Sequence, residues 1–70
     1  MTTETRLLRA VVTLKSALAG MRRLAADHPD ASARRVFADE ARRVETMLGR
    51  LEERLRAVRR QEPEYGERTR

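Results

Sequence analysis

Residues 37–58 read FADEARRVETMLGRLEERLRAV, and apolar side chains recur in this stretch at alternating steps of four and three. They are Phe37, Ala41, Val44, Leu48, Leu51, Leu55 and Val58. Residues 7–25 repeat the same spacing. Here the apolar positions are Leu7, Val11, Leu14, Leu18, Met21 and Ala25. Apolar residues that recur every seven positions are typical of helices that pack along a long seam. The sequence therefore predicts two long helices.

A turn signal, Asp27-His28-Pro29-Asp30, separates the two stretches. The residue before a proline is biased away from helical geometry, and aspartate is a good N-cap for the helix that follows. We expect one helix over about residues 4–26, with Thr2 or Thr3 as its cap, and a second over about 31–61. Together they form an all-α, two-helix antiparallel hairpin.

The end of the second helix is predicted from Glu62-Pro63, because proline is incompatible with a helix interior. Residues 1–61 then form the hairpin, and residues 62–70 form a polar C-terminal tail. A turn at Pro29 sets Leu7 level with Leu51. On that register Leu55 and Val58 extend past the start of the first helix, so we expect a second protomer or the tail to cover them.

The chain is short and strongly basic. It has 70 residues, a formal net charge of +5 and no cysteine. This length allows one small domain, and no disulfide or thiolate metal site can brace it. No apolar run approaches the ~20 residues of a membrane span, and no signal-peptide core follows the N-terminus. We therefore expect a cytoplasmic protein that does not insert into a membrane.

The apolar face of the first helix is wider than one partner helix needs. It is flanked by Leu8, Val12, Ala19 and Ala26 on one side and by Ala10, Ala17 and Leu24 on the other. A helix that is apolar over so wide an arc is usually buried on more than one side. We expect a homodimer in which two hairpins form a four-helix bundle. The predicted contacts are Leu8, Val12, Ala19, Leu24, Met47, Leu55 and Val58. A lone hairpin, a hetero-partner and a higher oligomer remain the alternatives.

Arginine concentrates near the end of the second helix. The cluster consists of Arg54, Arg56, Arg59 and Arg60. It is the candidate phosphate-binding surface of a weak, sequence-nonspecific nucleic-acid binder. Acids elsewhere on the helix stand three or four residues from arginines, as Asp39 does from Arg42, which is typical of a solvated surface. Cations also favour a helix C-terminus, and no aromatic residue is placed to stack on bases. Nucleic-acid binding is therefore the less favoured function.

No catalytic, metal-binding or cofactor-binding constellation is recognisable. His28 is the single histidine, and the chain has no cysteine, so His28 has no second nitrogen or sulfur ligand with which to share a metal. It also lacks a nucleophile placed beside it, and we expect it to face solvent or to help cap the turn. The sequence predicts no enzyme and no cofactor, but a structural or protein-interaction module.

Several short segments of the chain resemble those of a known protein family. They are Leu14-Lys15-Ser16-Ala17, Phe37, Leu51-Glu52-x-Arg54-Leu55 and the ending Gln61-Glu62-Pro63-Glu64-Tyr65. In these segments the chain resembles a family of short bacterial proteins, domain of unknown function family 1657, found largely in endospore formers. The resemblance implies a spore-associated accessory protein working beside a membrane complex. It also makes Glu62, Pro63 and Tyr65 a candidate docking tail for a protein partner. The alternative for this tail is a helix stop with Tyr65 folded over Leu55 or Val58.

Overall fold

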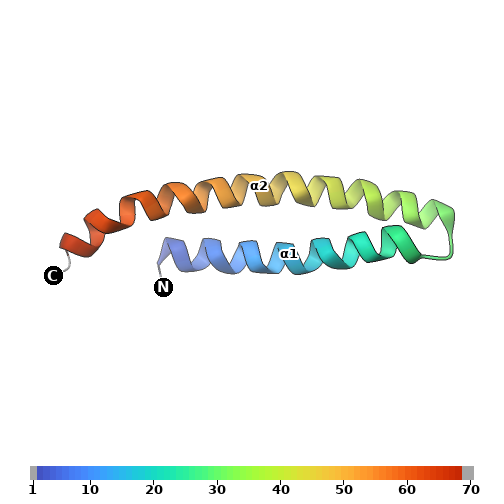
Figure 1. The fold of residues 1–70 in the computed structure, drawn as a ribbon, viewed down its shortest axis with the longest axis horizontal. Coiled ribbons are helices and arrows are strands. Elements are labelled where there is room, and N and C mark those ends of the chain that lie inside the picture. The colour runs from blue at the N-terminus through green and yellow to red at the C-terminus, as the bar shows by residue number, and fades with distance from the viewer. Residues whose placement is uncertain (1, 69–70) are drawn as a thin grey trace.

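The computed structural model describes residues 2–68, with side chains described from 2 to 61, and consists there of two antiparallel helices (Figure 1). Helix α1 spans Thr3–Asp27, and helix α2 spans Ala31–Arg68. The predicted all-α hairpin is therefore confirmed. The predicted dimer stays a prediction.

Both helices begin at side-chain caps. The hydroxyl of Thr2 accepts a hydrogen bond from the backbone N–H of Thr5 at 3.1 Å. The carboxylate of Asp30 accepts from the N–H groups of Ser32 and Ala33, each at 3.3 Å. These bonds occupy donors that a helix start otherwise leaves without partners. Both caps agree with the sequence prediction.

The connection between the helices is braced from α2. His28 is extended, with φ −60° and ψ 135°, and its Nδ1 accepts from the N–H of Asp30 at 3.0 Å. The Arg34 guanidinium donates to the carbonyl oxygens of His28 at 2.7 Å and Pro29 at 3.3 Å. The His28 ring also lies 5.9 Å from the Phe37 ring, centroid to centroid. His28 thus helps to cap the turn, as predicted, while the role of Arg34 was not foreseen.

The core is a single seam between the helices. The buried residues are Val11, Leu18, Ala41, Val44, Leu48 and Leu55. Half-buried side chains of Leu7, Leu14, Met21 and Leu51 pack against them. All of these residues belong to the two apolar stripes of the sequence. Even the most buried, Val11 and Leu18, retain 4% exposure, because one layer of side chains has no second layer above it.

Helix α2 is longer than predicted. The expectation that Pro63 ends it near residue 61 is wrong, since the helix continues to Arg68. Proline removes one main-chain hydrogen bond and crowds the preceding turn, which a helix accommodates by bending. The flanking Gln61, Glu62 and Glu64 are good helix formers. Figure 1 shows α2 curving in these last turns as it projects past the start of α1. The side chains of Glu62, Pro63 and Tyr65 lie outside the described residues.

The register between the helices also differs from the prediction. Nε of Arg59 lies 3.7 Å from Oε1 of Glu4, so the start of α1 lies beside Arg59. Leu55 is consequently packed inside the hairpin and is only 6% exposed, and Val58 is half-buried. The expectation that Leu55 extends past the start of the first helix, and so needs cover from a second protomer or from the tail, is therefore wrong. The reason is the extended connection, which lets α2 begin beyond the end of α1 (Figure 1).

Candidate interaction surface

The hairpin has two flanks, one on each side of its seam. Because a helix turns by about 100° per residue, the position after each seam residue lies on one flank and the position before it lies on the other. We call the first the groove flank. It consists of Leu8, Val12, Lys15, Ala19, Arg22 and Ala26 of α1 and Ala38, Arg42, Glu45, Gly49, Glu52, Arg56 and Arg59 of α2. We call the second the opposite flank. It consists of Arg6, Ala10, Thr13, Ala17, Gly20 and Leu24 of α1 and Val36, Glu40, Arg43, Met47, Arg50, Arg54 and Ala57 of α2.

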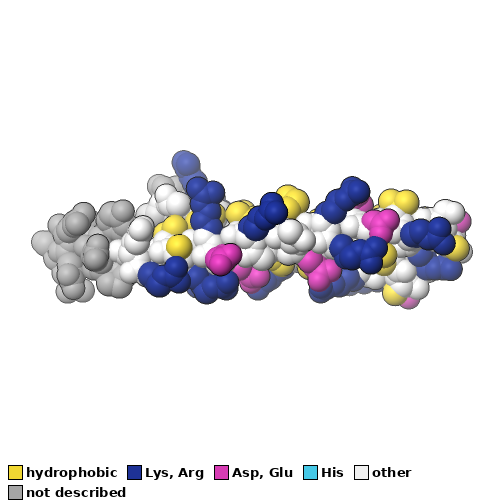
Figure 2. Space-filling view, turned by 90° about the horizontal axis from the view of Figure 1, so that it is seen from above, with side chains coloured by type: hydrophobic (Ala, Val, Ile, Leu, Met, Phe, Trp, Pro, Cys, Tyr) yellow, Lys and Arg dark blue, Asp and Glu magenta, His cyan; other side chains and the backbone are white. Residues whose placement is uncertain are grey.

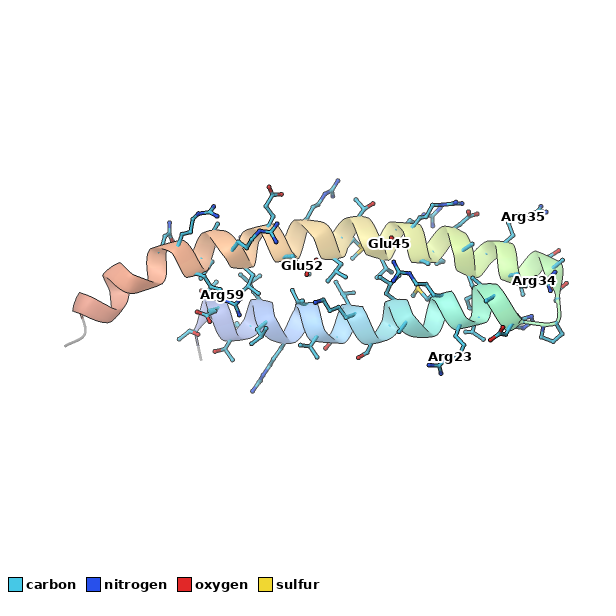
Figure 3. All side chains as sticks on the ribbon, viewed as in Figure 1. Arg23, Arg34, Arg35, Glu45, Glu52 and Arg59 are labelled. Carbon is cyan, nitrogen blue, oxygen red and sulfur yellow. The ribbon has the colours of Figure 1, made fainter. Side chains whose placement is uncertain are left out.

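Ion pairs bridge the two helices along the groove flank. Nζ of Lys15 lies 3.5 Å from Oε2 of Glu52, and Nη2 of Arg22 lies 3.0 Å from Oε2 of Glu45. The two pairs are seven residues apart on each helix, so they repeat with the seam. Figure 3 shows Glu45 and Glu52 placed between the two ribbons. Exposed pairs of this kind add ~0–1 kcal/mol each, so they contribute more to register than to stability.

A groove of about 400 Å³ lies between these two ion pairs. Its lining consists of Lys15, Leu18, Ala19, Arg22, Glu45, Leu48, Gly49 and Glu52. The buried Leu18 and Leu48 give it an apolar floor, and the four charged side chains form its rim. A Cβ added at Gly49 would meet no atom within 4 Å, so packing inside the hairpin does not require this glycine. The groove is therefore an open surface next to small residues.

Large apolar side chains remain exposed on both flanks. Leu8 and Val12, on the groove flank, are 40% and 56% exposed. Leu24, Val36 and Met47, on the opposite flank, are 41%, 58% and 49% exposed. Of the predicted contacts, Leu8, Val12, Leu24 and Met47 are thus accessible, and Ala19 is exposed and lines the groove. Val36 was missing from the prediction. The signal that identifies it is its position directly before the seam residue Phe37.

The C-terminal arginines do not share one face. Arg54 lies on the opposite flank, Arg56 and Arg59 lie on the groove flank, and Arg60 follows Arg59 by a further 100° or so. Arg59 pairs with Glu4. Within residues 2–61, neither Arg54 nor Arg56 has an acidic group within ion-pair distance. Glu52, four residues before Arg56, pairs with Lys15 instead, and no acid stands three or four residues from Arg54.

The surface charges of α2 are partly compensated within the helix. Arg42 pairs with Asp39, as predicted, and Nη1 of Arg43 lies 2.6 Å from Oε1 of Glu40. In Figure 2, Lys and Arg side chains are spread along the described length of the molecule, with acidic side chains between them. This distribution differs from the single basic face that typically follows a phosphate backbone.

Two further findings concern the described residues alone. No group of three or more His, Cys, Asp or Glu side chains gathers there in a way that could hold a metal ion. Neither helix, over the same part of the chain, combines the length and apolarity that crossing a bilayer requires.

Compared with known proteins, the chain matches no family model, no curated protein and no solved structure. The fold and its surface therefore carry the functional argument. They define a class of molecule: a short helical hairpin with a single-seam core, a groove bridged by ion pairs and apolar side chains exposed on both flanks.

Proposed function

We propose that the protein is a non-enzymatic interaction module that acts by self-association of its hairpin. The observation that carries this proposal is the set of five large apolar side chains that are 40–58% exposed. The hairpin cannot bury them itself, because its two helices already face each other along the seam. Leu8 and Val12 lie four residues apart on one flank of α1, so they adjoin on the helix surface, and adjoining exposed apolar side chains in a folded protein are typical of interaction sites.

The small core supports a second copy as the partner. In the described part of the chain, the buried side chains come from the seam alone, and the sequence has no cysteine that could form a disulfide. Scaffolds of this length usually need an additional brace, and oligomerisation is one of the common ones. Two hairpins packed together would form a four-helix bundle, in which exposed flanks become an interior.

Nucleic-acid binding has one observation in its favour, the absence of an acidic partner for Arg54 and Arg56 within residues 2–61. The spread of the arginines around α2 weakens it. The two functions respond differently to salt. Binding to phosphate weakens steeply between low and physiological salt, whereas an association based on apolar burial does not.

The cellular setting belongs to the same proposal. We place the protein in the cytoplasm and, following its resemblance to family 1657, in an accessory role in spore formers beside a membrane complex. In that setting Glu62, Pro63 and Tyr65 would dock a protein partner. A Tyr65→Ala variant that keeps its thermal stability but loses the partner would support docking, whereas lost stability would support a packing role for Tyr65.

Chemical unfolding at two protein concentrations tests the proposed self-association. Association stabilises the folded state by mass action, so the unfolding midpoint of a dimer rises with protein concentration. We expect such a rise over about a hundredfold range of concentration, followed by the helical circular dichroism signal. A midpoint that stays constant over that range would contradict self-association.

A further inference from the structure

We infer that the second copy docks on the groove flank, with α1 of one copy lying against α2 of the other. This inference rests on the proposed self-association and specifies its surface and its helix order. The competing surface is the opposite flank, which also exposes large apolar side chains.

The charges at the rim of the groove favour α1 over α2, rather than α1 over α1, in the pair of copies. The bases Lys15 and Arg22 line the α1 edge of the groove, and the acids Glu45 and Glu52 line the α2 edge. A copy that lays its α1 over α2 places bases over acids at both contacts of the symmetric pair. A copy that lays α1 over α1 places Lys15 and Arg22 against their own equivalents, and like charges disfavour such a complex.

The four charged side chains of the rim are still open to a second copy. In the hairpin their side chains are between 35% and 59% exposed. Each acid can therefore accept a second base on its open side. Since a carboxylate has about four lone-pair directions, sharing one acid between two bases requires no new geometry within the hairpin.

The direction of the helices agrees with this order. In a pair related by a two-fold axis parallel to the helices, both turns lie at the same end and every neighbouring helix is antiparallel. The dipoles of neighbouring helices are then antiparallel at all four helix–helix contacts, which is the electrostatically favourable arrangement. The interface is the same patch on both copies, as closed two-fold symmetry requires.

The shape of the groove flank allows close approach. Ala19 and Gly49 present almost no side chain at the groove, and a Cβ at Gly49 would contact nothing in its own hairpin. Small residues of this kind let helix axes approach closely. Leu8 and Val12 lie on the same flank of α1, so α2 of the second copy would cover them.

The opposite flank is a poorer surface for a second copy because of how its charges are arranged, not because of their sum. Both flanks carry a net charge of +3, from five bases and two acids on the groove flank and from four bases and one acid on the opposite flank. On the opposite flank α1 carries one charge, Arg6, and the one acid, Glu40, already pairs with Arg43 of its own helix. A two-fold pair on this flank therefore sets no bases of α1 over acids of α2, and α2 against α2 brings arginines together.

Two matched substitutions test the surface. Val12 and Val36 are exposed valines on different flanks, at 56% and 58%. Val12→Glu is expected to raise the dimer dissociation constant at least about tenfold, because a carboxylate would be buried at the contact. Val36→Glu should leave it within about twofold, as expected for a residue outside the contact. Sedimentation equilibrium measures both, and unchanged helical circular dichroism shows that each hairpin is intact.

The outcomes separate this inference from the proposed function. A wild-type chain that stays monomeric overturns the proposed self-association. A wild-type dimer that survives Val12→Glu but dissociates with Val36→Glu leaves self-association standing and overturns the groove flank as its surface.

Cross-linking tests the helix order, because the native chain contains no cysteine that could react. Ala19→Cys and Gly49→Cys proteins are mixed and treated with a short thiol-to-thiol cross-linker. If α1 lies against α2 of the other copy, the product joining Ala19→Cys to Gly49→Cys predominates. A predominant product joining two Ala19→Cys chains would overturn this order and place α1 against α1.

Discussion

Arg22 of α1 and Glu45 of α2 meet across the groove, with Nη2 and Oε2 3.0 Å apart. This pair and the Lys15–Glu52 pair one heptad away join the helices on a single flank. Both acids would have been assigned to neighbours on their own helix by spacing alone. In the hairpin, these two acids of α2 instead pair with bases of α1.

Removing this pair should change stability only slightly. Arg22 and Glu45 are 59% and 47% exposed, so solvent screens their attraction. A double-mutant cycle with Arg22→Ala and Glu45→Ala, made at a protein concentration at which the hairpin is monomeric, should give a coupling free energy below about 1 kcal/mol, which decreases further in about 1 M salt. Urea unfolding measures it. A larger coupling that does not depend on salt in the monomer would contradict the exposed geometry of the pair. In the proposed dimer, docking on the groove flank covers the pair, so there we expect the coupling to rise and its salt dependence to weaken.

Truncating the seam should be far more damaging. Leu18 is 4% exposed and contacts the core of the hairpin, so Leu18→Ala should cost about 2–5 kcal/mol through lost burial and an unfilled cavity. Leu24→Ala is the matched control, because Leu24 lies on the opposite flank at 41% exposure. Equal losses from the two leucines, measured by thermal unfolding, would contradict the seam as the dominant source of stability.

The turn should depend on the Asp30 cap. Asp30→Ala removes the acceptor for the N–H groups of Ser32 and Ala33 and should cost about 1 kcal/mol of unfolding free energy. Asp27→Ala is the control on the other side of the turn. It lies in the last turn of α1, where a negative charge opposes the helix dipole, so its removal should be neutral or mildly stabilising. The opposite ranking of the two variants would refute the assigned cap.

The two glycines inside the helices should respond differently to alanine. Neither Gly20 nor Gly49 would place a Cβ against any atom of the hairpin. Gly20→Ala should therefore stabilise the protein by up to about 1 kcal/mol, through helix propensity alone. Gly49→Ala should gain less, because in the proposed dimer the second copy lies over the groove. Equal gains, measured by urea unfolding under conditions in which the wild type is dimeric, would count against a close helix at Gly49.

Local signals explain the parts of the fold that the sequence predicts correctly. The seam follows from heptad spacing, the turn follows from Pro29, and the start of α2 follows from Asp30, since each depends on residues close together in the chain. The exposed side chains Leu8 and Val12 of the candidate surface were predictable for the same reason. They lie outside the part of the α1 surface that one partner helix can cover.

The features that were missed depend on how the two helices lie in space. The register was wrong because the extended connection shifts α2 relative to α1, and no local pattern encodes that shift. Arg34 braces the turn through carbonyl oxygens five and six residues earlier, a contact that helix spacing does not suggest. The helical end of α2 beyond Pro63 was missed because the sequence rule treats proline as a stop, whereas a long helix can bend past it.

The decisive measurement for self-association is the molar mass in solution, obtained by light scattering at micromolar concentration and at low and physiological salt. We expect twice the chain mass of 8.1 kDa at both salt levels, since apolar burial supplies most of the association free energy and the rim charges mainly set its orientation. A mass of 8.1 kDa at both salt levels would contradict self-association and would require a different protein to cover the exposed flanks of the hairpin.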